Sequence, residues 1–206
     1  MSADVKAMAA VERGELADFL ETLAPEHWDV PSLCTGWTVR DVVTHMIGYD
    51  ELGLLRTIGS LARSGFSLHR SNAKRVAEAE HTPAELIALL RKHQRPRGIT
   101  AAFGGFIALV DGTVHHQDIR RALGKPREIP ADRLRATLRL ALRARPIHAA
   151  QRAKGLGLVA SDVDWTHGDG PQVRGPGEAL LMALAGRAEA LAELTGPGVA
   201  TLAGRV

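Results

Sequence analysis

The stretch DGTVHHQDIRRALG, residues 111–124, combines two carboxylates and two imidazoles with the apolar spacing of a helix that ends at a glycine. Asp111 and His115 are four residues apart, so they share one helix face and can both reach one ion. Carboxylate and imidazole groups are good ligands for divalent metals such as zinc. His116 is five residues from Asp111, which turns it away by about 140°. Asp111 and His115 are therefore the candidate ligands on this helix, in preference to His116.

A third ligand has to come from another helix, and His45 is the best candidate. It lies inside an apolar segment that begins at TVRD, where Thr38 and Asp41 can form an acidic variant of the capping box. Helix bundles commonly build metal sites from side chains that project inward from facing helices. Two other interpretations stay open at this point. His45 could be a hydrogen-bonded core histidine, and the spacing of Asp111 and His115 could be a coincidence on a solvated face.

Other polar residues near these positions also allow more than one role. Asp118, three residues after His115, could orient a metal ligand or form a surface ion pair with Arg120 or Arg121. The two arginines could instead bind an acidic group of a substrate, although surface ion pairing explains them equally well.

Cys34 is the single cysteine of the chain, and it lies in a segment with no histidine near it in the sequence. A lone cysteine of this kind is more often a small buried side chain than a nucleophile. We expect Cys34 to be structural and to fill a small apolar gap under the start of the helix that carries His45.

The composition of the 206 residues is that of a folded protein in a reducing compartment. Hydrophobic residues make up 45% of the chain, and one cysteine cannot form an internal disulfide. No apolar run approaches about 18 residues, and the first residues lack the apolar segment of a signal peptide. The sequence therefore predicts a cytoplasmic protein with no membrane partner.

The net charge of +3 is spread along the chain and does not by itself indicate a nucleic-acid partner. Arginines spaced by four at Arg135, Arg139 and Arg143 could contact phosphates, but no aromatic residues interleave with them. We interpret this stripe as the solvated side of an amphipathic helix and expect no nucleic-acid partner.

Apolar periodicity and capping signals predict a mainly α-helical chain with a small α+β segment at its end. We expect a helical metal-binding domain over residues 1–146 and a small α+β segment over residues 147–206. Residues 64–81 look irregular, with a short helical piece. Two short strands and an alanine-rich helix follow residue 155. The predicted helices of the first domain cover residues 3–23, 38 to about 62, 82–93, 102–123 and 131–146.

Three stretches together resemble the mycothiol-dependent maleylpyruvate isomerase family, which lies within the DinB-like superfamily of metalloenzymes. LCTGWTVRDVVTHMIGYDELG has a Cys-x-Gly-Trp loop followed by a histidine eight residues after the tryptophan, and VDGTVHHQDIRRALGKP has the acid-x-x-x-His-x-x-Asp pattern. The C-terminal segment, from DVDWTHGDG to LAGR, is similar as well. The resemblance implies an up-down-down-up four-helix bundle of the DinB-like type.

The resemblance also implies a divalent ion, often zinc, held by His45, Asp111 and His115. The family pattern has glutamate where this chain has Asp111, so the ion or its geometry could differ here. Three protein ligands leave an open position that a low-molecular-weight thiol such as mycothiol could enter. The implied function is isomerisation of a small electrophile, or transfer of the thiol to it. A non-catalytic metal-stabilised binding module and a metal-dependent hydrolase remain alternatives, because a fold does not fix a reaction.

Overall fold

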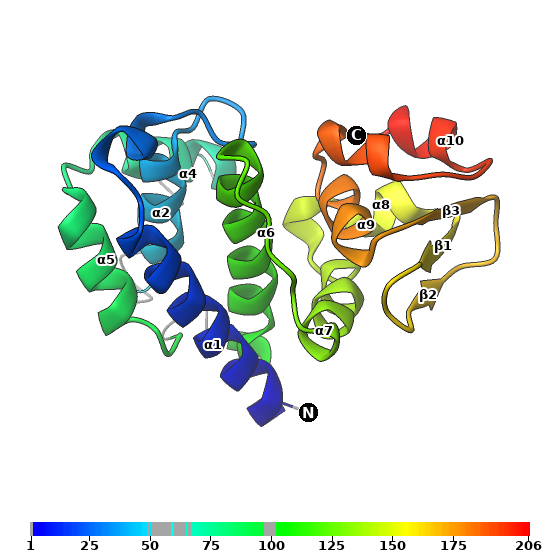
Figure 1. Ribbon diagram of the computed structural model, residues 1–206, viewed down its shortest axis with the longest axis horizontal. Helices are drawn as coiled ribbons and strands as arrows, with labels where there is room; N and C mark the ends of the chain where they lie inside the picture. Colours follow the sequence, from blue (N-terminus) through cyan, green and yellow to red (C-terminus); the bar gives the residue numbers. More distant parts are fainter. Residues whose placement is uncertain (1, 49, 51–58, 60–64, 66, 97–101) are drawn as a thin grey trace. The chain divides into compact units, whose positions relative to one another are not determined.

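The computed structural model describes residues 2–48, 50, 59, 65, 67–96 and 102–206. The chain divides into two compact units, Met1–Pro126 and Arg127–Val206 (Figure 1). The boundary expected from the sequence, after residue 146, falls inside the second unit. Helix α7 (Ala131–Ala141) packs against α9 (Gly177–Leu184) within that unit, so its apolar face is buried there.

The described residues of the first unit include a bundle of four helices, α1 (Ser2–Glu21), α2 (Val39–Gly48), α5 (Pro83–Lys92) and α6 (Phe106–Ala122). Helix α1 packs against α5 and α6, and α2 packs against the same two helices, so each helix has two neighbours in the bundle. The predicted four-helix bundle is thus present. Its core is built from apolar side chains that include Leu16, Leu20, Trp28, Val39, Val43, Met46, Leu86, Leu90 and Ile119.

The ends of these helices follow the predicted capping signals. The Thr38 amide donates to Asp41 Oδ2 at 2.9 Å, and the Asp41 amide donates back to Thr38 Oγ1 at 3.2 Å. Helix α5 has the same reciprocal arrangement between Thr82 and Glu85. These boxes satisfy amide groups that a helix start leaves without intrahelical partners. The first of them fixes where α2 begins, about two turns before His45.

Helix α4 (Leu68–Ala77) corrects the expectation that residues 64–81 are mostly irregular. It begins at Ser67, whose hydroxyl accepts from the Arg70 amide at 3.3 Å. Its polar composition concealed the apolar periodicity on which the prediction depended. The predicted continuation of the second helix to about residue 62 lies mostly outside the described residues. The described part of the unit also contains two shorter 3₁₀ helices, η1 (Pro25–Asp29) and η2 (Ala102–Gly105).

The second unit combines a small sheet with short helices. Strand β1 (Gly157–Ala160) lies between β2 (Thr166–His167), which is antiparallel to it, and β3 (Gln172–Gly175), which is parallel to it. The helix predicted over residues 178–194 breaks near Gly186, whose φ of 94° does not fit a helix, into α9 and the 3₁₀ helix η4 (Ala188–Glu193). The remaining elements are η3 (Arg145–Ile147), α8 (Ala149–Ala153) and α10 (Val199–Ala203).

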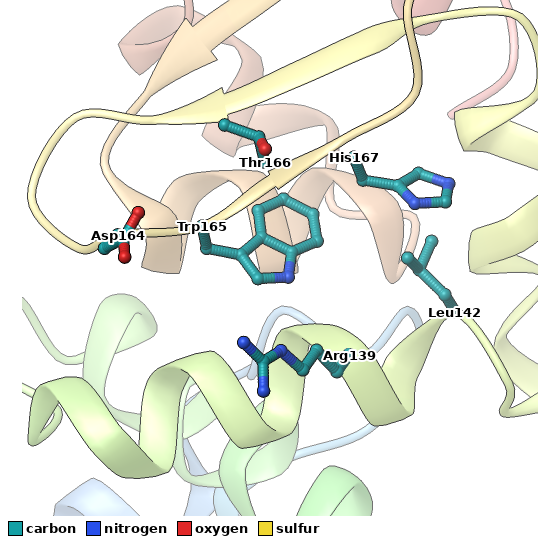
Figure 2. Close-up of a pocket in the computed structure, with 6 residues that line it drawn as sticks. All are labelled: Arg139, Leu142, Asp164, Trp165, Thr166 and His167. Carbon is teal, nitrogen blue, oxygen red and sulfur yellow. The ribbon is translucent and has the colours of Figure 1, made fainter.

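A pocket of about 400 Å³ lies within the second unit, between α7 and the segment around β2 (Figure 2). The Trp165 ring is buried at its wall and stacks on His167, with ring centroids 6.3 Å apart and an interplanar angle of 19°. None of the residues that the sequence nominated as metal ligands contributes to this pocket. The pocket is lined by Arg139, Leu142, Asp164, Trp165, Thr166 and His167.

Among the helices of the described residues, none has the length and apolarity needed to cross a membrane.

Candidate metal centre

The three nominated ligands lie together inside the first unit. The His45 side chain comes from α2, and those of Asp111 and His115 come from consecutive turns of α6. Asp111 Oδ1 is 3.6 Å from His45 Nε2 and 3.5 Å from His115 Nε2. The two imidazole rings meet edge to face, with centroids 5.0 Å apart. One ligand atom from each residue lies within 4.8 Å of the other two.

These distances fit a small divalent ion better than direct hydrogen bonds. In a tetrahedral zinc site with ligand bonds of about 2.0–2.1 Å, neighbouring ligand atoms are about 3.3 Å apart. The observed 3.5 and 3.6 Å are close to that spacing, whereas hydrogen bonds between charged groups are usually about 2.7–2.9 Å. Two imidazoles and one carboxylate are also a donor set that such ions accept.

The centre is covered on its histidine side and open on its carboxylate side. His45 and His115 are 8% and 12% exposed, whereas Asp111 is 33% exposed. The Trp37 ring packs over His45, with centroids 5.0 Å apart. Gly36, with a φ of 78°, takes the turn that brings Trp37 back to this position. The most exposed of the three side chains is therefore that of Asp111.

The electrostatics of the three residues are coupled. Burial alone would lower the pKa of His115, but the nearby charge of Asp111 and the contacts with Asp118 and Cys34 raise it well above the ordinary value. Burial alone would raise the pKa of Asp111, but the neighbouring His115 and His45 hold it well below the ordinary value. Burial lowers the pKa of His45, although Asp111 acts in the opposite direction. Asp111 is thus ionised and His45 neutral near neutral pH, so both can offer lone pairs.

The other nitrogen of His115 faces a buried carboxylate. Its Nδ1 is 2.9 Å from Asp118 Oδ2, and the Asp118 side chain is fully buried. An ionised carboxylate can only accept, so His115 carries a proton on Nδ1. The alternative of a surface ion pair between Asp118 and an arginine does not match this buried position. Many metal-binding histidines have such an outer carboxylate partner, which fixes the ring and its tautomer.

Cys34 lies beside this pair, which the sequence did not indicate. Its Sγ donates to Asp118 Oδ2 at 3.1 Å and is 3.5 Å from His115 Nδ1. Cys34 also packs against the hydrophobic core, as its apolar character predicts. The expectation that it only fills an apolar gap was therefore incomplete. The prediction considered only residues close to Cys34 in the sequence, and its polar neighbours His115 and Asp118 are far from it along the chain.

Cys34, His115 and Asp118 could in principle form a second metal-binding group. The separations of 2.9 and 3.1 Å that Asp118 Oδ2 makes with the other two are hydrogen-bond distances. They are shorter than the spacing of ligand atoms around zinc. We therefore assign these residues to a hydrogen-bonded group that supports His115.

His116 points toward α1, about 100° around α6 from His115. Its Nδ1 is 2.8 Å from Glu12 Oε1, and its Nε2 accepts from Arg120 Nε at 2.9 Å. His116 and Glu12 are both completely buried, so neither nitrogen of His116 is available to an ion. This geometry agrees with the expectation that His116 is not a ligand. The sequence did not indicate its pairing with Glu12, because the two residues are far apart in the chain.

Arg120 and Arg121 were nominated as weak candidates for binding substrate. The Arg120 guanidinium stacks over the Phe19 ring at 3.8 Å and donates to the carbonyl of Lys125 at 3.2 Å. Arg121 is half-buried on the same helix. A role for either residue in binding substrate stays a prediction.

Comparisons with known proteins bear directly on the segment that contains Cys34 and His45. Residues 9–97 match the family model described as the mycothiol maleylpyruvate isomerase N-terminal domain. This part of the chain is therefore similar to that domain. The resemblance stated from the Cys-x-Gly-Trp loop and His45 is thereby confirmed.

The mycothiol maleylpyruvate isomerase fold extends over nearly the whole chain. A crystal structure of the mycothiol-dependent maleylpyruvate isomerase matches with a TM-score of 0.56, and a crystal structure of a histidine-to-alanine mutant of it matches with 0.61. In both cases the identity is 16%, and the match covers 96% of this chain and 93% of the other. No curated protein matches the sequence. The fold therefore includes α6 with Asp111 and His115, which lie beyond the residues of the N-terminal family match.

Proposed function

We propose that this protein is a metal-dependent enzyme that uses a low-molecular-weight thiol of the mycothiol type to isomerise a small electrophile or to transfer the thiol to it. The observation that carries this proposal is the placement of His45 Nε2 and His115 Nε2 at 3.6 and 3.5 Å from the same oxygen of Asp111. Zinc is one of the divalent ions that this donor set accepts, and it is the ion we would test first. The similar fold of a mycothiol-dependent isomerase supports the choice of thiol.

The protein residues prepare the centre before any substrate arrives. Asp118 accepts the Nδ1 proton of His115, which turns Nε2 toward Asp111. Burial keeps His45 neutral, so its Nε2 lone pair is available near neutral pH. When bound, a divalent ion with three protein ligands has an open position that can accept a thiol and favour its ionised form.

The chain needs an external thiol because its own cysteine faces away from the open side. Cys34 Sγ lies at the Nδ1 side of His115, whereas Asp111 and His45 lie at the Nε2 side. The partly exposed Asp111 marks the side from which thiol and electrophile would enter. A cis double bond activated by a carbonyl group, as in maleylpyruvate, is the electrophile we would test first.

The test mixes metal-free protein, zinc, mycothiol and maleylpyruvate, and it repeats the assay with protein, zinc or mycothiol left out in turn. We expect cis–trans conversion only when protein, zinc and mycothiol are all present, and none with His45→Ala. The matched control is His167→Ala, which removes an exposed histidine in the second unit. Cleavage of maleylpyruvate by water, with zinc but without thiol, would replace the proposal by a hydrolase. Binding of zinc and thiol without turnover of any electrophile would replace it by a non-catalytic binding module.

A further inference from the structure

The loop over residues 32–37 touches both histidines of the centre. The Trp37 ring packs on His45, and Cys34 Sγ shares Asp118 Oδ2 with His115 Nδ1. His45 and His115 belong to different helices, so this loop is a physical connection between the two ligand-bearing helices.

The loop itself is held by a compact set of hydrogen bonds. Ser32 Oγ accepts from the Cys34 amide at 3.1 Å and donates to the Trp37 carbonyl at 2.8 Å. The Trp37 amide donates to the Cys34 carbonyl at 2.9 Å, which closes the turn. The Leu33 amide donates to the main-chain carbonyl of Asp118 at 3.3 Å, so the loop is also docked on α6. Cys34 is therefore presented to Asp118 by backbone geometry and not by a freely moving segment.

Asp118 Oδ2 is the atom on which the two donors converge. The side chain has no exposure to water, and a buried carboxylate oxygen needs donors to offset its lost hydration. His115 supplies one donor and the Cys34 thiol supplies another. A thiol is a weak donor in water, but it counts for more where no water competes.

We propose that Cys34 is a positioning residue of the metal centre, acting through Asp118 to fix the ring and tautomer of His115. This inference rests on the proposed metal centre, because the consequence for function is that His115 Nε2 points toward Asp111 and the proposed ion. In this role the Cys34 thiol is the hydrogen-bond donor and Asp118 Oδ2 is the acceptor. Cys34 is neither a metal ligand nor a nucleophile, because its sulfur lies at the Nδ1 side of the ring.

The experiment compares Cys34→Ala, which removes the donor, with Cys34→Ser, which keeps one. Zinc affinity is measured by competition with a chromophoric chelator. Outer partners of metal-binding histidines typically contribute about 10–100-fold in affinity. We expect Cys34→Ala to weaken zinc binding by about tenfold, at the low end of that range because a thiol is a weak donor. Cys34→Ser should restore most of the loss.

A double-mutant cycle separates positioning from general structural support. Asp118→Asn should weaken zinc binding more than Cys34→Ala, and adding Cys34→Ala to Asp118→Asn should have almost no further effect. Independent, additive effects would overturn the inference. Equal zinc affinity in wild type and Cys34→Ala would overturn it too. A sulfur-to-metal charge-transfer band in the cobalt-substituted wild type would show that Cys34 is a ligand, which would also overturn it.

A measurement without metal keeps this test apart from that of the proposed function. Nitrogen-15 NMR of the His115 ring in metal-free protein should show a proton on Nδ1 in a strong hydrogen bond. Cys34→Ala should weaken that bond, and Cys34→Ser should restore it. If wild-type protein binds no zinc, the proposed function fails while the NMR comparison still decides the role of Cys34. If Cys34→Ala does not fold, Cys34→Ser and Asp118→Asn carry the same comparison.

Discussion

Helix α6 carries adjacent histidines, His115 and His116, that face different surroundings. His116 is completely buried, and both of its nitrogens lie within 2.9 Å of a partner on Glu12 or Arg120. His115 is 12% exposed, and its Nε2 is 3.5 Å from the nearest oxygen of Asp111. The two faces of α6 thus use the same residue type for different purposes. The face with His116, which we call the closed face, joins α6 to α1. The face with Asp111 and His115, which we call the open face, would hold an ion between α6 and α2.

The largest effect is expected from His45→Ala on the open face. Two ligands on one helix would remain, so zinc affinity should fall by more than the roughly 10–100-fold that outer partners contribute. Elemental analysis of purified protein should find about one metal per chain in wild type and almost none in the variant. If His45→Ala kept its metal content, the open face would not be the metal-binding face, and this prediction would be wrong. The exposed His167→Ala variant should retain its metal.

His116→Ala should lower the stability of the fold and leave the metal content almost unchanged. It leaves the buried Glu12 carboxylate and the Arg120 guanidinium without their shared partner, and breaking a buried ionic network typically costs about 3–5 kcal/mol. We expect the free energy of unfolding in urea to fall by about that amount. Metal content per folded chain should change little. Loss of metal from a variant that is still folded would show that the closed face takes part in the centre.

The pH dependence of zinc binding should come from His115. Its raised pKa means that metal-free protein holds a proton on both nitrogens near neutral pH, and zinc must displace the one on Nε2. Asp111, with a lowered pKa, is already ionised, and His45, with a lowered pKa, is already neutral. Affinity should therefore fall by up to about tenfold per pH unit below the pKa of His115 and level off above it.

Isothermal titration calorimetry in buffers of different ionisation enthalpy checks this expectation. It should detect the release of one proton per zinc bound near neutral pH. Release of two protons would mean that His45 is charged as well. A pH-independent affinity would contradict the assignment of His115 as a ligand.

The smallest effect is expected from Arg120→Lys on the closed face. Lysine keeps the charge but loses the planar guanidinium that stacks on Phe19 and donates to His116. The expected loss is about 1 kcal/mol in the free energy of unfolding, measured by urea denaturation. Zinc affinity should stay within about twofold of wild type, a difference of about 0.4 kcal/mol. A marked loss of affinity would show that the closed face supports the metal ligands.

Local signals in the sequence were enough to predict much of the fold and part of the candidate centre. The capping boxes at Thr38 and Thr82 predicted the starts of α2 and α5, because those bonds join residues only three apart. The spacing of Asp111 and His115 placed them on one face for the same reason. The break near Gly186 was missed, because an alanine- and leucine-rich sequence continues past it with high helix propensity.

Contacts between distant residues could not be read from spacing. The pairing of Glu12 with His116, and that of Cys34 with Asp118, depend on how the helices pack. His45 was nominated because it is a polar residue in an apolar helix, a signal that cannot distinguish a metal ligand from a hydrogen-bonded core histidine. Packing of α2 against α6 brings His45 close to Asp111 and His115, which spacing along the chain could not show.

The proposed ligands of the centre are far apart in the chain, since His45 precedes Asp111 by about 66 residues. A bound ion would join α2 to α6 as a cross-link and close a loop that contains α4 and α5. In the chain-entropy treatment of disulfides, closing a loop of this length is worth about 4 kcal/mol. Unfolding of the first unit would then require release of the ion, and chelation would shorten the lifetime of the folded chain. The supply of metal would thus govern how long the protein persists as well as whether it reacts.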